Sequence, residues 1–183
     1  AHGAYLRFLP EDRHPITLGA DLCCDSAHKT LPVLTGGAYL HIGKNAPEVF
    51  ARGGKQALAL FGSTSPSYLT LASLDLCNLY LEEKIQEDLQ RLLPAISKTK
   101  EMLMQKGWEV TGTEPMKITI RCAGTEIADR LRKHNIECEY ADRDFLVLMP
   151  SAQTTKEDLN RLVEAIGENT YSPSAGMPEL SQP

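Results

Sequence analysis

A long helical pattern between residues 68 and 107 divides this chain into two parts. Apolar side chains recur there at three- and four-residue spacing, as on the buried face of a helix: Leu81, Ile85, Leu89, Leu92 and Leu93. Pro94 is expected to end or kink the first of two helices, because proline removes a backbone donor, and Gly107 to end the second. We therefore expect one unit over residues 1–80 and a small α+β unit over residues 81–183.

Before this pattern, short apolar stretches alternate with turns. Residues 16–24 and 31–42 have the pattern of strands, the second broken by a glycine pair, with a polar turn over residues 26–30 between them. A short helix is expected over residues 47–60 and a loop over residues 62–67.

In the second part, strand and helix patterns interleave, which is typical of an α+β module. The expected elements are strands over 108–110 and 117–121, a helix over 124–135, strands over 136–140 and 145–150, and a helix over 154–166. The remaining residues, from about 167, are rich in Ser, Pro and Gly and are expected to form a loose tail.

Composition excludes several classes of protein. The chain is 42% hydrophobic and carries a net charge of −5, which argues against a nucleic-acid partner. No apolar run has the length of a membrane span, and no segment resembles a signal peptide. The cysteines fit neither a disulfide framework nor a zinc pattern, so we expect free thiols in a reducing cytoplasm: Cys23, Cys24, Cys77, Cys122 and Cys138.

The run Asp25-Ser26-Ala27-His28-Lys29-Thr30 has the clearest chemical meaning. A lysine that follows a strand and has hydroxyl and imidazole neighbours can form a Schiff base, provided that partial burial lowers its pKa. By composition alone, a lysine in a polar turn is more often a solvated surface group.

Four segments together resemble one family. Residues 19–35, Gly-Ala-Asp-Leu-Cys-Cys-Asp-Ser-Ala-His-Lys-Thr-Leu-Pro-Val-Leu-Thr, closely resemble the cofactor-lysine segment of the bacterial ornithine/lysine/arginine decarboxylases. The opening Ala-His-Gly-Ala of residues 1–4, the loop and helix start of residues 63–75, and residues 136–142 resemble three further segments of that family, in the same order.

The resemblance implies an α/β fold: the C-terminal part of the large domain of a pyridoxal-phosphate (PLP)-dependent transferase of fold type I, followed by a small α+β C-terminal domain. Lys29 would hold pyridoxal 5'-phosphate as a Schiff base and would act in catalysis with His28. The residues implied in cofactor binding are Lys29, Ser26, His28, His2, Ala1, Thr64 and Ser65, with Ser26 at the phosphate, Ala1 against the ring and the Thr64–Ser65 loop completing the site.

The implied activity is decarboxylation of arginine, lysine or ornithine to the amine, as in polyamine biosynthesis. The resemblance also implies a small-molecule substrate, a cytoplasmic location and a homodimer or higher homo-oligomer. Two alternatives stay open: another fold-type-I activity, such as an aminotransferase or lyase, and a dimerisation module without turnover.

One departure from the family concerns the pyridine nitrogen of the cofactor. The acidic residue that pairs with it in the family lies two positions before Ala1, so we expect a fragment that lacks an N-terminal part and that catalyses inefficiently alone.

No metal site is expected from the histidines, which lack metal-ligand spacing and are interpreted as ordinary polar or core residues: His2, His14, His28, His41 and His134. Glu139 and Asp142 could either reach a neighbouring active site or form a solvated strand end.

Overall fold

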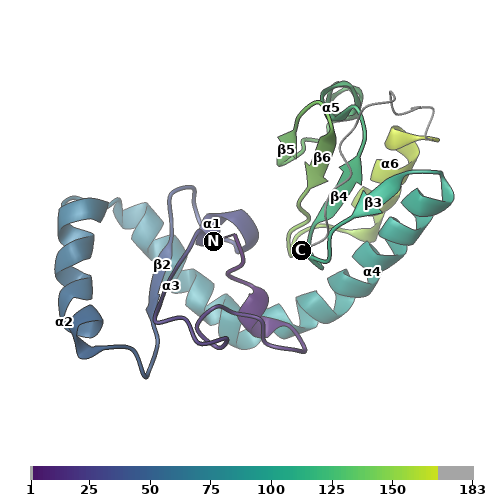
Figure 1. The fold of residues 1–183 in the computed structure, drawn as a ribbon. Coiled ribbons are helices and arrows are strands. Elements are labelled where there is room, and N and C mark those ends of the chain that lie inside the picture. The colour runs from purple at the N-terminus through teal and green to yellow at the C-terminus, as the bar shows by residue number, and fades with distance from the viewer. Residues whose placement is uncertain (1, 169–183) are drawn as a thin grey trace. The chain divides into compact units, whose positions relative to one another are not determined.

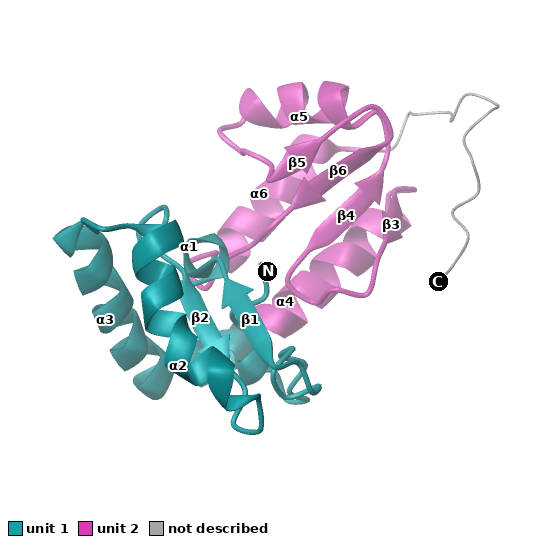
Figure 2. Cartoon of the chain, turned by 60° about the vertical axis from the view of Figure 1, so that its left-hand side comes forward, with its two compact units in different colours: residues 1–91 teal, residues 92–183 magenta. Residues whose placement is uncertain are grey.

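The computed structural model describes residues 2–168 (Figure 1). The chain divides into two compact units, Ala1–Arg91 and Leu92–Pro183 (Figure 2). The domain boundary near residue 80 stays a prediction.

A two-stranded antiparallel hairpin organises the first unit. It pairs β1 (Leu22–Asp25) with β2 (Tyr39–Ile42), and Cys23 lies opposite His41. The other elements of this unit are the short 3-10 helix η1 (Leu6–Phe8), α1 (Ala27–Thr30), α2 (Glu48–Ala57), the π-helical turn η2 (Leu58–Gly62), α3 (Tyr68–Glu83) and the start of α4 (Ile85–Gln105).

Both strands of the hairpin are shorter than the sequence pattern predicts. Residues 15–19 form a turn instead, in which the Ala20 N–H donates to the Pro15 carbonyl and Gly19 adopts a φ of +102°. In the second stretch, Gly36 has a φ of +91°, and only residues 39–42 pair. The predicted polar turn after β1 is the four-residue helix α1. Residues 15–19 and the residues around Gly36 therefore form hydrogen-bonded turns, although their apolar content alone predicts strands.

The prediction that Pro94 separates two helices is wrong about the position of the break. Helix α3 ends at Glu83, and Lys84 leaves helical geometry at a φ of −130°, whereas Pro94 lies inside α4. Leu92 and Ile96 on either side of Pro94 are 1% and 0% exposed. Their burial offsets the hydrogen bond that the proline cannot donate.

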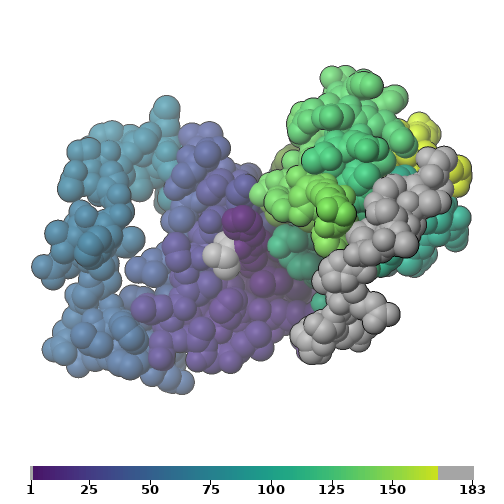
Figure 3. Space-filling view, turned by 45° about the horizontal axis from the view of Figure 1, so that its top comes forward, coloured from purple at the N-terminus to yellow at the C-terminus, as the bar shows by residue number. Residues whose placement is uncertain are grey.

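The segment from α2 to α3 exposes many large apolar side chains. The exposed side chains on η2 and α3 are Leu58, Leu60, Phe61, Tyr68, Leu69, Leu71, Leu76 and Leu79. In the space-filling view the blue α2 and η2 segment stands away from the purple strand region of the same unit (Figure 3). Helix α3 is apolar on all sides, which is typical of a helix covered by protein around its whole circumference.

The second unit is a four-stranded antiparallel sheet covered by helices. The strands β3 (Glu109–Thr111), β4 (Ile118–Arg121), β5 (Tyr140–Ala141) and β6 (Phe145–Leu148) lie in the order β3-β4-β6-β5. Its helices are the end of α4, then α5 (Gly124–Arg132) and α6 (Lys156–Ile166). The core combines alternate strand residues with the inner faces of these helices: Ile96, Leu103, Ile118, Ile120, Leu131, Leu146, Leu162 and Ile166.

Most sequence-predicted elements of this unit are confirmed. Gly107 ends α4 with a φ of +84°, and the Trp108 N–H donates to the Leu103 carbonyl, as in a glycine-terminated helix. Thr155 starts α6 with a capping box that includes Asp158. The strand expected over residues 136–140 is shorter, because the Ile136 N–H bonds back to Leu131 at the end of α5. Of the expected tail, residues 169–183 lie outside the described residues.

The five cysteines form no disulfide with one another in the structure. Within residues 2–168, no helix is both long and apolar enough to span a membrane.

Gly124 permits a contact that no other residue allows. A methyl group on its α-carbon would lie 1.9 Å from the carbonyl oxygen of Phe145. We expect Gly124→Ala to lower the free energy of unfolding by about 2 kcal/mol or more, because backbone must move. Gly53→Ala is the control: the α2 position has open space around it, and we expect no loss there. Urea unfolding of both variants measures the difference, and equal stabilities would contradict the close approach.

Candidate functional site

Lys29 lies on α1, directly after β1. The lysine and Ser26 are half-buried, and Ser26 occupies the N-cap position of α1 without a side-chain capping bond. The strand-to-helix turn therefore places Ser26, His28 and Lys29 on one short segment, as the sequence motif requires.

The ring of His28 is oriented by the backbone. The carbonyl oxygen of Gly37 lies 3.0 Å from His28 Nδ1 and also accepts the His28 backbone N–H at 3.3 Å. This contact assigns the proton of the neutral ring to Nδ1 and leaves Nε2 as an acceptor. A side chain at Gly37 would lie 2.3 Å from Val33 Cγ1, so the glycine pair positions the carbonyl that holds His28.

The other sequence-predicted site residues lie elsewhere along the chain. His2 is exposed, and Thr64 and Ser65 lie in an exposed loop between η2 and α3, where the Ser65 N–H donates to Ser63 Oγ at 3.2 Å. Ala1 lies outside the described residues. The roles assigned to all seven residues stay predictions.

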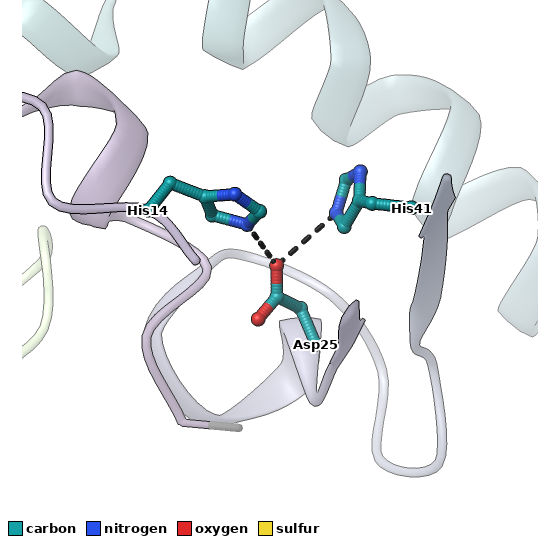
Figure 4. A group of neighbouring side chains, drawn as sticks. All are labelled: His14, Asp25 and His41. Atoms are coloured by element: carbon teal, nitrogen blue, oxygen red, sulfur yellow. Dashed lines mark hydrogen bonds and ion pairs between the residues drawn. The ribbon is translucent and has the colours of Figure 1, made fainter. Parts of the chain in front are cut away.

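A cluster of three side chains lies beside this segment, and its grouping was not predicted. Figure 4 shows His14 and His41 pointing at the same carboxylate oxygen of Asp25. The distances from Asp25 Oδ2 are 2.7 Å to His14 Nε2 and 3.1 Å to His41 Nε2. Asp25 is 0% exposed and His14 is 5% exposed.

The hairpin register explains the cluster. Cys23 and Asp25 are the buried residues of β1, and they lie opposite His41 and Tyr39 respectively. Directly opposed residues share one face of an antiparallel pair, so all four side chains lie on the same face. The turn over residues 15–19 then brings His14 across that face.

Burial shifts the pKa of His41 and of the neighbouring Cys23. Desolvation lowers the pKa of His41, and the neighbouring Asp25 carboxylate opposes that shift. His14 accepts the Ile16 N–H at Nδ1, 3.3 Å away, so its neutral ring donates from Nε2 to Asp25. Burial, followed by the Asp25 charge, raises the pKa of the Cys23 thiol, which keeps that sulfur protonated.

A cavity of about 490 Å³ lies next to the cluster, within the first unit. Its lining includes Arg7, His14, Tyr39, His41 and Asn78. Tyr39 is held in place by its hydroxyl, which donates to the Leu74 carbonyl at 2.9 Å. The His41 side chain is 40% exposed, so part of its ring is accessible from the cavity.

Asp142 has a local structural role in the second unit. Its carboxylate accepts the Tyr140 hydroxyl at 2.7 Å and the backbone N–H groups of Asp144 and Phe145. The tyrosine hydrogen bond is the main cause of its lowered pKa. These contacts favour the strand-end interpretation of Asp142 and form the turn between β5 and β6.

Comparison with known proteins identifies the family. The model of the Orn/Lys/Arg decarboxylase major domain matches residues 1–123, and the chain belongs to this family. It is 31% identical over 165 residues to the Bacillus subtilis protein YaaO, covering 81% of this chain and 34% of that one. It is 28% identical over 189 residues to an arginine decarboxylase of the same organism, covering 92% and 38%. The chain thus spans roughly a third of the length of these relatives.

Solved structures show the same fold. The lysine decarboxylase of Francisella novicida matches with a TM-score of 0.67 at 20% identity, over 79% of this chain and 27% of that one. An alanine–glyoxylate aminotransferase from Nostoc sp. matches with a TM-score of 0.63 at 20% identity, over 82% and 48%. The chain therefore has the fold of the C-terminal part of PLP-dependent fold-type-I enzymes, as the sequence predicts.

PLP use follows from the family, and the residues around α1 fit such a group. Lys29 supplies an amine and Ser26 a hydroxyl that does not cap the helix. Among the described residues around α1, the buried hydroxyl of Thr30, next to Lys29, has no hydrogen-bond partner. Buried hydroxyls normally find a partner, so polar groups of a cofactor are suitable occupants here.

The Asp25 cluster predicts a measurable loss of stability on truncation. Asp25→Ala leaves the buried His14 ring without its acceptor, so we expect the free energy of unfolding to fall by about 2 to 3 kcal/mol. Cys24→Ala, on the exposed face of the same strand, is the matched control and should change it by less than about 0.5 kcal/mol. Urea denaturation followed by circular dichroism compares them, and similar losses would show that Asp25 does not anchor the hairpin.

Proposed function

We propose that the parent polypeptide, of full family length, is a PLP-dependent decarboxylase that converts arginine, lysine or ornithine into its amine. The observation that carries this proposal is the position of Lys29 on a short helix after β1, with Ser26 and His28 on the same turn. The family match and the similarity to an arginine decarboxylase support it.

In this proposal PLP supplies an electron sink when it is bound. Lys29 would hold the cofactor through its amine. Once the substrate amine displaced it from the cofactor, the Lys29 amine would be free to donate a proton to the substrate carbon that loses carbon dioxide. Ser26 would donate its hydroxyl to the cofactor phosphate. His28, whose ring is fixed by the Gly37 carbonyl, would contact the cofactor ring and assist proton transfer. His2, Ala1, Thr64 and Ser65 would complete the binding site.

A second candidate is another fold-type-I activity, such as an aminotransferase or lyase. This second candidate is supported by the TM-scores, because the fold of the chain is about as similar to that of an aminotransferase (0.63) as to that of a lysine decarboxylase (0.67). The two activities differ in their products, because decarboxylation releases carbon dioxide and transamination leaves a keto acid. Incubating the parent polypeptide with arginine, lysine and ornithine separately, and measuring both products, distinguishes them. Keto acid without carbon dioxide would overturn the decarboxylase proposal.

Cofactor attachment at Lys29 is testable by absorbance. We expect PLP to give a band near the visible edge that borohydride removes, and Lys29→Ala to abolish it. Lys55→Ala, an exposed lysine on α2, is the control and should keep the band. A wild-type protein without the band would instead support a non-catalytic dimerisation module. A band unchanged by Lys29→Ala would contradict Lys29 as the residue that holds the cofactor.

We also propose that the parent polypeptide forms a homodimer or higher homo-oligomer. The exposed apolar side chains of η2 and α3 support this, since such a surface is typical of an interface. Leu76→Asp should shift the assembly toward monomers, because burying an unpaired carboxylate disfavours association. Gln86→Asp, at an exposed polar position of α4, is the control. Light scattering coupled to size exclusion measures the masses, and an unchanged mass for Leu76→Asp would contradict an interface at α3.

A further inference from the structure

We propose that His14, Asp25 and His41 form a binding site for one divalent transition-metal ion, with Zn²⁺ the best chemical match. Two imidazoles and one carboxylate are a common ligand set for zinc sites that keep a fourth position open.

Small side-chain shifts would bring the ligand atoms to the spacing that a single ion needs. One ligand atom from each of His14, Asp25 and His41 lies within 4.8 Å of the other two, and the His14 and His41 Nε2 atoms lie 2.7 and 3.1 Å from Asp25 Oδ2. The two ring centroids are 5.0 Å apart and the rings are nearly perpendicular, at 81°. Zinc–nitrogen bonds of about 2.0 to 2.1 Å place two imidazoles on a tetrahedral ion with their centroids about 5 Å apart. Binding would lengthen the 2.7 Å contact between His14 and Asp25, because two ligand atoms on a tetrahedral zinc ion lie about 3.3 Å apart.

The charge of the cluster also favours a cation. Asp25 is 0% exposed, and its carboxylate accepts hydrogen bonds from His14, His41 and Cys23. A buried carboxylate is costly unless it is paired or ligates a metal. A divalent ion shared with two neutral imidazoles would supply that compensation.

An entry path and a fourth ligand position are both present. The cavity of about 490 Å³ reaches His14 and His41, and the His41 side chain is 40% exposed. An ion could therefore enter past His41, and water from the cavity could occupy its open position.

Metal binding requires one rearrangement in the cluster. His14 Nδ1 accepts the Ile16 N–H at 3.3 Å, whereas a neutral ring that binds metal through Nε2 carries its proton on Nδ1. Metal binding would therefore break the hydrogen bond from Ile16 to His14 and the hydrogen bonds from the two histidines to Asp25. Three bonds from the metal to His14, His41 and Asp25 would replace them. The ion would then join the loop at His14 to both strands of the hairpin that precedes Lys29.

The test is a titration of the intact, metal-free chain with Zn²⁺ by calorimetry, and with Co²⁺ by visible absorbance, both without PLP. We expect one ion per chain and the intense visible bands of tetrahedral Co²⁺. His41→Asn should weaken Zn²⁺ binding at least 100-fold, since it removes one of three protein ligands, and it should fold because His41 is partly exposed. His134→Asn, an exposed histidine of the second unit, is the matched control and should bind as the wild type does.

A further variant separates the proposed site from adventitious thiol binding. Cys23→Ser should retain stoichiometric Zn²⁺ binding within about threefold, because the sulfur is a neighbour of the cluster and not a proposed ligand. Absence of Zn²⁺ and Co²⁺ binding by the wild type would overturn the proposal. So would equal affinities of His41→Asn and His134→Asn, or loss of binding in Cys23→Ser. In each case the cluster is a hydrogen-bonded histidine–aspartate–histidine group only.

Discussion

The carboxylate of Asp25 is the constraint on which the first unit depends. It is fully buried at the end of β1 and accepts hydrogen bonds from a histidine of the preceding loop and a histidine of the partner strand. A charged group in such a place is tolerated only when its partners stay in position. Because α1 follows Asp25 within two residues, the same contacts determine where Lys29 emerges from the strand.

The elements that the sequence predicts well are those with local signals. The glycine after α4 and the alternating strands of the second unit each depend on a few neighbouring residues. The first unit was harder to predict because its apolar stretches are divided by turns, at residues 15–19 and around Gly36. The helix break at Lys84 was missed since Pro94 is a stronger local signal, and burial of Leu92 and Ile96 overrides it.

The candidate site shows the same division. The Ser26, His28 and Lys29 motif is contiguous, so its resemblance to a family is readable from the sequence. The partners of Asp25 come from positions 14 and 41, and only the strand register brings them together. An aspartate at an inward-facing position of a strand, two residues after the buried Cys23, was the available signal. Likewise, the contact of Gly37 with His28 depends on a turn whose geometry no spacing rule encodes.

The apolar helix α3 has a consequence for how the polypeptide behaves before it is complete. A surface carrying Leu69, Phe61 and Leu76 in water attracts other apolar segments, so a newly synthesised chain that presents it is prone to aggregate. Holdase chaperones recognise surfaces of this kind. Recovery of the chain from cells should therefore depend on chaperone supply and on how quickly the surface is covered, independently of the chemistry at Lys29.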